Sequence, residues 1–111
     1  MPEWVRVAAV ADLTPGEKLA VTVAGEEIAL FNLDGAFYAI GDTCTHAQAS
    51  LADGDFYENI VECPLHGSPF DVTSGKALGL PAMGNSGCYA IKAEDGGLFV
   101  DPVPVTLRSL R

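Results

Sequence analysis

Residues 42–67 read DTCTHAQASLADGDFYENIVECPLHG, and two short motifs in this stretch carry the prediction of the fold. The first motif is Cys44-Thr45-His46 and the second is Cys63-Pro64-Leu65-His66-Gly67, with sixteen residues between His46 and Cys63. The chain has no other histidine, and two of its three cysteines lie in these motifs. Random placement would rarely put every histidine so close to a cysteine. We therefore predict that the two motifs form one ligand site.

Each motif lies between two strand-like segments, which places it on a loop. Two such loops can approach each other and present two thiolates and two imidazoles to one site. This set could hold zinc tetrahedrally, although zinc sites usually pair Cys with Cys and His with His along the chain. One sulfur and one nitrogen ligand on each loop suit a two-iron cluster, in which one iron takes both cysteines and the other both histidines.

The remainder of the chain predicts an all-β fold. Short apolar segments alternate with turn signals, and no segment has the length and periodicity of an amphipathic helix. Ala24-Gly25-Glu26 and Asp34-Gly35 supply the residues that tight hairpin turns require. We predict a single domain over residues 1–111 with Greek-key or meander connections. The predicted strands are Trp4–Val7, Leu19–Val23, Ile28–Leu33, Phe37–Ile40, Phe56–Tyr57, Ile60–Val61, Phe70–Val72, Tyr89–Ala93 and Leu98–Val100.

The sequence is acidic, with a formal net charge of −9 over 111 residues. This balance argues against nucleic acid as a partner, because phosphates attract Lys and Arg. Nine acidic residues and no Lys or Arg lie between Lys18 and Lys76, and they form either a solubilising surface or one that steers a basic partner protein. Residues 1–20 carry charges at intervals and no apolar targeting or membrane segment. We therefore expect a cytoplasmic protein without a membrane partner.

At the two motifs the sequence resembles the Rieske family, whose ligand boxes they match in order and spacing. Residues 69–78 (PFDVTSGKAL) resemble the strand and turn after the second box, and Leu80-Pro81-Ala82 resembles the loop that covers the cluster. The resemblance implies a Rieske-like fold of three stacked antiparallel sheets, with two cluster-binding loops at one tip. It also implies one [2Fe-2S] cluster, with the ligands Cys44, His46, Cys63 and His66.

The resemblance also bears on the reduction potential. Neutral histidine ligands leave the oxidised centre uncharged, which raises the potential into a range of roughly −150 to +300 mV. Family members with high potential carry a disulfide between the loops and a tyrosine, where this chain has Ala49, Leu65 and Phe70, so we expect the lower half of that range. Ser68 favours a higher value if it donates to a bridging sulfide rather than serving as a turn residue. We expect Ser68, Phe70 and Pro81 to tune the cluster.

Within the family, the sequence resembles the ferredoxin component of bacterial aromatic ring-hydroxylating dioxygenase systems, which serve aromatic hydrocarbon catabolism. Such a ferredoxin is no enzyme but an electron carrier, which passes single electrons from a flavin-containing NAD(P)H reductase to a terminal oxygenase. An oxygenase would need further histidines for a mononuclear iron, and none remains. A nucleophile–base pair of Cys63 and His66 would leave the first motif unexplained. The alternatives are the small Rieske subunit of NADH-dependent nitrite reductase and a zinc-stabilised binding module.

Partner docking is expected around the exposed imidazole edges of a monomer. Pro64 and Leu65 from the second motif, and Pro81 and Met83 from the covering loop, would form an apolar tip. An acidic surround that attracts basic partner proteins would include Asp42, Asp53, Asp55 and Glu58. Cys88 lies outside both motifs and is expected to be a small packing residue without a ligand role.

Overall fold

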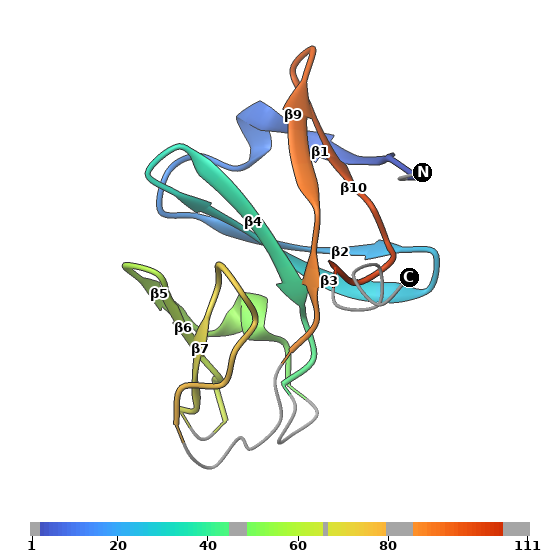
Figure 1. Cartoon of the computed structure of the whole chain (residues 1–111). Helices are drawn as coiled ribbons and strands as arrows, with labels where there is room; N and C mark the ends of the chain where they lie inside the picture. The colour runs from blue at the N-terminus through green and yellow to red at the C-terminus, as the bar shows by residue number, and fades with distance from the viewer. Residues whose placement is uncertain (1–2, 45–48, 66, 80–85, 106–111) are drawn as a thin grey trace.

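A computed structural model describes residues 3–44, 49–65, 67–79 and 86–105. Three antiparallel sheets make up the fold, which confirms the predicted fold class (Figure 1). The strands are β1 (Val5–Ala9), β2 (Lys18–Val23), β3 (Glu26–Leu33), β4 (Ala36–Gly41), β5 (Asp55–Tyr57), β6 (Ile60–Glu62), β7 (Pro69–Asp71), β8 (Cys88–Tyr89), β9 (Ile91–Glu94) and β10 (Gly97–Val100). Their orders in the sheets are β1-β10-β9, β2-β3-β4-β8 and β5-β6-β7. The short 3-10 helices η1 (Val10–Asp12) and η2 (Leu51–Asp53) were not predicted.

The hairpin turns form at the residue pairs that favour them. Ala24-Gly25, Asp34-Gly35 and Asp95-Gly96 have positive φ at both residues, between 50° and 95°. Two successive residues of this kind are typical of tight hairpin turns, whose twist matches that of the flanking strands. Glu58, in the turn between β5 and β6, also has a positive φ of 52°. The turns thus fix which strands become sequential antiparallel neighbours.

The predicted strand Tyr89–Ala93 was wrong, because the structure has two strands there. Tyr89 in β8 lies opposite Ala39 of β4, whereas Ile91 in β9 lies opposite Val100 of β10. The chain changes sheets at Ala90, whose carbonyl accepts a hydrogen bond from the Asp101 N–H over 3.1 Å. Alternating residues identify extended chain but do not identify its partner strand.

The four-stranded sheet forms the middle layer and contacts a hydrophobic core on each face. Along β3, Ile28 and Leu30 join a cluster that includes Leu98 of β10, whereas Ala29 and Phe31 join a different cluster that includes residues of β6 and β7. Alternation with a period of two therefore serves both cores from one strand. Within the described ranges, no helix reaches the length and apolar character that a membrane crossing requires.

Candidate metal centre

The first motif lies on the loop that follows β4. The loop begins as a narrow stem, in which Thr43 and Ser50 form an antiparallel bridge and the Cys44 N–H donates to the Ala49 carbonyl over 2.9 Å. The Cys44 side chain is buried, with 3% exposure. His46 lies outside the described residues. The stem thus fixes the backbone of Cys44 while its thiol packs into the core.

The second motif lies on the loop between β6 and β7. The Cys63 N–H donates to the Ser68 carbonyl over 2.9 Å, and the Gly67 N–H donates to the Cys63 carbonyl over 2.9 Å. Gly67 has a φ of +73°, which a residue without Cβ adopts at the least cost. Cys63 is 2% exposed, and His66 lies outside the described residues. A tight, hydrogen-bonded loop therefore holds the second thiol.

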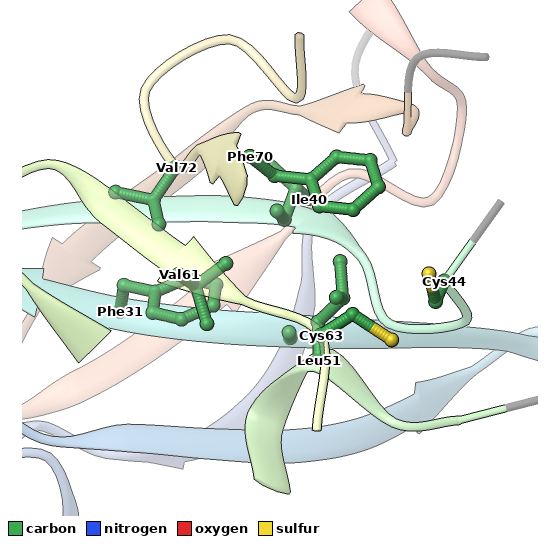
Figure 2. Packing of buried hydrophobic residues seen from close by; sticks show 9 residues of the cluster. Phe31, Ile40, Cys44, Leu51, Val61, Cys63, Phe70 and Val72 are labelled. Carbon is green, nitrogen blue, oxygen red and sulfur yellow. The ribbon is translucent and has the colours of Figure 1, made fainter. Parts of the chain in front are cut away.

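Both cysteines belong to one buried cluster between the middle sheet and the β5-β6-β7 sheet, called here the cysteine-bearing cluster. Its members are Ala29, Phe31, Ile40, Cys44, Leu51, Val61, Cys63, Phe70 and Val72. Figure 2 shows the sulfur atoms of Cys44 and Cys63 at the same end of this cluster. Neither of the two forms a disulfide within the described part of the chain. Two thiols that are not consumed by a disulfide, supplied by two loops at one place, fit the two-cysteine half of a Rieske centre.

The residues expected to tune the cluster lie partly in the described chain. Ser68 and Phe70 are both 0% exposed, and Phe70 belongs to the cysteine-bearing cluster. Ala49 is partly buried against the same cluster, whereas Leu65 is 58% exposed. Phe70 therefore adds apolar packing where a tyrosine would bring a hydroxyl. Pro81 lies outside the described residues.

An acidic hollow of about 330 Å³ opens beside the second loop. Its lining joins three carboxylates to residues of that loop: Asp53, Gly54, Asp55, Glu62, Cys63, Pro64 and Gly67. The described residues of this lining include no Lys or Arg. Pro64, which lines the hollow, and the following residue Leu65 are both exposed, and Met83 lies outside the described residues. The structure thus brings Asp53 and Pro64 together, beside a predicted ligand.

Glu58 does not lie with this group, contrary to expectation. The register of the β5–β6 hairpin places Asp55 opposite Glu62, so the turn at Glu58 is at the other end of the hairpin from Cys63 (Figure 1). Glu58 lines a different hollow, with Phe56 among its neighbours. The turn signal Glu58-Asn59 between two short strands could have revealed this separation from the sequence.

Two residues beside the loops were not selected from the sequence. Glu27 of β3 accepts a hydrogen bond from the Thr43 Oγ over 3.2 Å, which places a carboxylate beside the first loop. Leu78 is 47% exposed, and its N–H donates over 2.8 Å to the carbonyl of Pro69, the residue with which β7 begins after the second loop. Both contacts depend on how distant segments pair, so no local pattern indicates them.

Cys88 lies in β8, opposite Ile40 of β4. Its thiol contacts the Thr73 carbonyl, with 3.8 Å between sulfur and oxygen. Burial raises the pKa of this thiol, and the negative charge of Asp71 raises it further. A thiol that stays neutral suits a packing role better than a ligand role.

Comparisons with known proteins show the family. Residues 3–100 match the family model of the Rieske [2Fe-2S] domain. The chain is 39% identical over 99 residues to the naphthalene 1,2-dioxygenase system ferredoxin component of Pseudomonas putida. This match covers 89% of the chain and 95% of the relative. The chain is also 44% identical over 93 residues to the 3-phenylpropionate/cinnamic acid dioxygenase ferredoxin subunit of Escherichia coli (strain K12). This match covers 83% of the chain and 87% of the relative.

A solved structure extends the similarity to three dimensions. The fold matches a chain in the complex of reduced oxygenase and oxidized ferredoxin in carbazole 1,9a-dioxygenase, with a TM-score of 0.85 and 32% sequence identity. The match covers 91% of this chain and 94% of that chain. With two loops of the expected kind, two buried thiols and a family match over most of its length, the chain belongs to the Rieske [2Fe-2S] family.

Proposed function

We propose that this protein is the ferredoxin of an aromatic ring-hydroxylating dioxygenase system, and that it carries single electrons from an NAD(P)H-dependent flavin reductase to the terminal oxygenase. The observation that carries this proposal is the pair of buried thiols, Cys44 and Cys63, at one end of the same core cluster. Relatives named as ferredoxin components support a carrier. The similar chain in an oxygenase–ferredoxin complex supports an oxygenase as partner. We further infer a cytoplasmic monomer.

The proposed ligands divide between the two irons by type. Cys44 and Cys63 would hold one iron, and His46 and His66 the other. When bound, the [2Fe-2S] cluster accepts and releases one electron. The role of the protein is to fix the ligands. Backbone hydrogen bonds hold both cysteines in place, and burial of the two side chains keeps the sulfur atoms away from water. Ligands fixed before the electron arrives need little rearrangement when the charge changes.

The acidic hollow is the proposed docking surface. Pro64 and Leu65 supply apolar contacts beside it, and Asp53 is one of its carboxylates. A carrier has to bind its reductase, leave it and then bind the oxygenase. Small and partly polar interfaces suit such exchange, because charge speeds encounter without making the complex permanent.

Metal analysis of freshly purified protein tests the cofactor ligands. We expect iron and acid-labile sulfide in equal amounts, about two of each per chain, and a Rieske-type EPR signal after reduction. His46→Cys or Cys63→Ser should alter or abolish the signal, whereas Cys88→Ala should leave it unchanged. Stoichiometric zinc without labile sulfide would contradict the ligand assignment and favour a zinc-stabilised module.

Stopped-flow spectroscopy tests the direction of electron flow. A flavin reductase and a terminal oxygenase from the same gene cluster should reduce and reoxidise the protein, respectively, and single turnover should yield hydroxylated product. Electron transfer to a nitrite reductase, with none to the oxygenase, would refute the proposal.

A further inference from the structure

We propose that Asp42 is a positioning residue for the first ligand loop, because its buried carboxylate joins the entry and exit of the loop on which Cys44 lies. This inference rests on the proposed role of Cys44 as a ligand. Asp42 directly follows β4 and is 5% exposed, so it does not belong to the exposed acidic surround in which the sequence placed it. Acidic side chains are seldom buried to this degree unless they have hydrogen-bond partners. The partners of Asp42 therefore indicate what it does.

The carboxylate of Asp42 contacts the far end of the loop. Its Oδ1 accepts a hydrogen bond from the Ser50 Oγ over 2.8 Å and another from the Ala52 N–H over 3.0 Å. Both donors come after residues 45–48, whereas Asp42 comes before them. One oxygen atom thus bridges the two ends of the loop.

The backbone of Asp42 reinforces the same connection. Its carbonyl accepts a hydrogen bond from the Leu51 N–H over 2.7 Å, and its N–H donates to the Glu27 carbonyl over 2.9 Å. Leu51 is 0% exposed and belongs to the cysteine-bearing cluster. Asp42 therefore ties the loop exit, the middle sheet and the core together, two positions before Cys44.

The second loop is held in another way. In its described part, backbone–backbone hydrogen bonds join Cys63 to Ser68 and Gly67 to Cys63, and such bonds survive most side-chain substitutions. At the first loop, one side chain contributes two of the bonds between entry and exit. A substitution at Asp42 can therefore loosen the first loop without changing a ligand or touching the second loop.

The two hydrogen bonds require an acceptor rather than a negative charge. Asp42→Ala removes the acceptor and leaves the Ser50 hydroxyl and the Ala52 N–H without this partner, so the loop ends can separate. Asp42→Asn retains a side-chain carbonyl oxygen of the same reach, which can accept both bonds. The asparagine variant should therefore rescue what the alanine variant loses.

The test compares cluster retention in holoprotein variants. Loss of visible absorbance in the presence of a strong iron chelator gives the rate of cluster release, and EPR of the reduced protein reports the ligand geometry. We expect Asp42→Ala to release the cluster at least about tenfold faster than wild type, with a broadened EPR signal. Asp42→Asn should stay within about twofold of the wild-type rate and keep its EPR signal.

Asp71→Ala is the matched control. The Asp71 Oδ1 also accepts a backbone and a hydroxyl hydrogen bond, from the Thr73 N–H over 2.9 Å and the Thr73 Oγ over 2.7 Å, but in the turn after β7. The Asp71 carboxylate has further hydrogen bonds with Ser74 in the same turn and with Asn59 in the turn between β5 and β6. The Asp71→Ala variant should release the cluster at the wild-type rate. If Asp42→Ala does not fold, Ser50→Ala tests the inference instead. This variant loses one of the two donors to Asp42, which should accelerate cluster release about two- to fivefold.

Three results would overturn the inference. The first is a wild-type rate of cluster release in Asp42→Ala, or in Ser50→Ala if Asp42→Ala does not fold. The second is the same acceleration of release in Asp42→Ala and Asp42→Asn. The third is an acceleration of release in Asp71→Ala as large as that in Asp42→Ala. Wild-type protein that binds no iron would instead overturn the proposed function, so the two failures are distinguishable.

Discussion

The Ser86 Oγ donates a hydrogen bond to the Gly41 carbonyl over 2.8 Å, across 45 positions of the chain. The Ser86 N–H also donates to the Gly75 carbonyl over 2.7 Å. Gly41 ends β4 just before the first ligand loop, and Gly75 lies in the turn after β7. Ser86 is 8% exposed, so it joins the ends of two strands where little water competes.

Ser86→Ala should lower the free energy of unfolding by about 1–3 kcal/mol, because the Gly41 carbonyl loses a buried donor. Urea unfolding at constant pH measures this change. Ser74→Ala is the control: the exposed Ser74 Oγ accepts a hydrogen bond from the Lys76 N–H over 3.2 Å, which water can replace, so the free energy should change by less than about 0.5 kcal/mol. Equal effects of the two substitutions would show that the Ser86–Gly41 bond adds nothing.

Gly54→Ala should disturb the base of the second ligand loop. A Cβ at Gly54 would lie 1.8 Å from the carbonyl oxygen of Glu62, the residue before Cys63. The backbone would have to move, which should cost about 2–4 kcal/mol of stability and reduce the iron bound per chain. Gly79→Ala is the control, since its Cβ would meet the Pro69 ring at 3.3 Å. Thermal unfolding and iron analysis compare the two, and a stable, fully loaded Gly54→Ala would contradict the packing described.

Asp53→Lys and Glu58→Lys make the same charge change in different places. Asp53 lines the acidic hollow with Cys63, whereas Glu58 lines the other hollow. Reduction by the cognate reductase should therefore slow more in Asp53→Lys, while both variants keep the wild-type EPR signal. The difference should shrink as salt rises, because at ~0.15 M salt screens exposed charges beyond about 8 Å.

Stopped-flow reduction across a salt series measures these rates. Leu65→Ala should slow transfer at every salt concentration, because it removes apolar contact rather than charge. Equal slowing by both lysine variants would mean that steering is not local to the hollow. Reduction rates that depend neither on salt nor on the two charge reversals would contradict electrostatic steering. The acidic residues would then serve only to keep the protein soluble.

Ser68→Ala should shift the reduction potential downward. A hydroxyl that donates to the cluster stabilises the reduced form, which is the more negative one, so its removal makes reduction harder. The side chain is 0% exposed, so water would not readily replace it. Protein-film voltammetry of the variant and wild type measures the shift, and the wild-type value should lie in the lower half of the roughly −150 to +300 mV range. An unchanged potential would leave Ser68 as a residue of the turn.

Local signals explain which parts of the molecule the sequence could predict. Asp34-Gly35 specifies a turn by itself, and the spacing of the motifs at Cys44 and Cys63 predicts a shared ligand site. The change of sheets at Ala90 depends on which strands become neighbours, and the hydrogen bond from Ser50 to Asp42 depends on how the loop closes. Neither feature produces a periodic pattern in the sequence, so both could be found only from the structure.

Cys88 should react slowly with iodoacetamide in the holoprotein. The thiolate is the reacting form, and burial, with the nearby charge of Asp71, raises the pKa of this thiol. Its alkylation rate should therefore keep rising with pH after that of a free cysteine has levelled off. Mass spectrometry of protein labelled over a pH series measures the rate. Cys88→Ala should take up no label while its cluster is bound and should keep the wild-type EPR signal, since Cys44 and Cys63 are the proposed ligands. Rapid labelling of Cys88 near neutral pH would contradict the raised pKa, and loss of the cluster in Cys88→Ala would contradict a packing role.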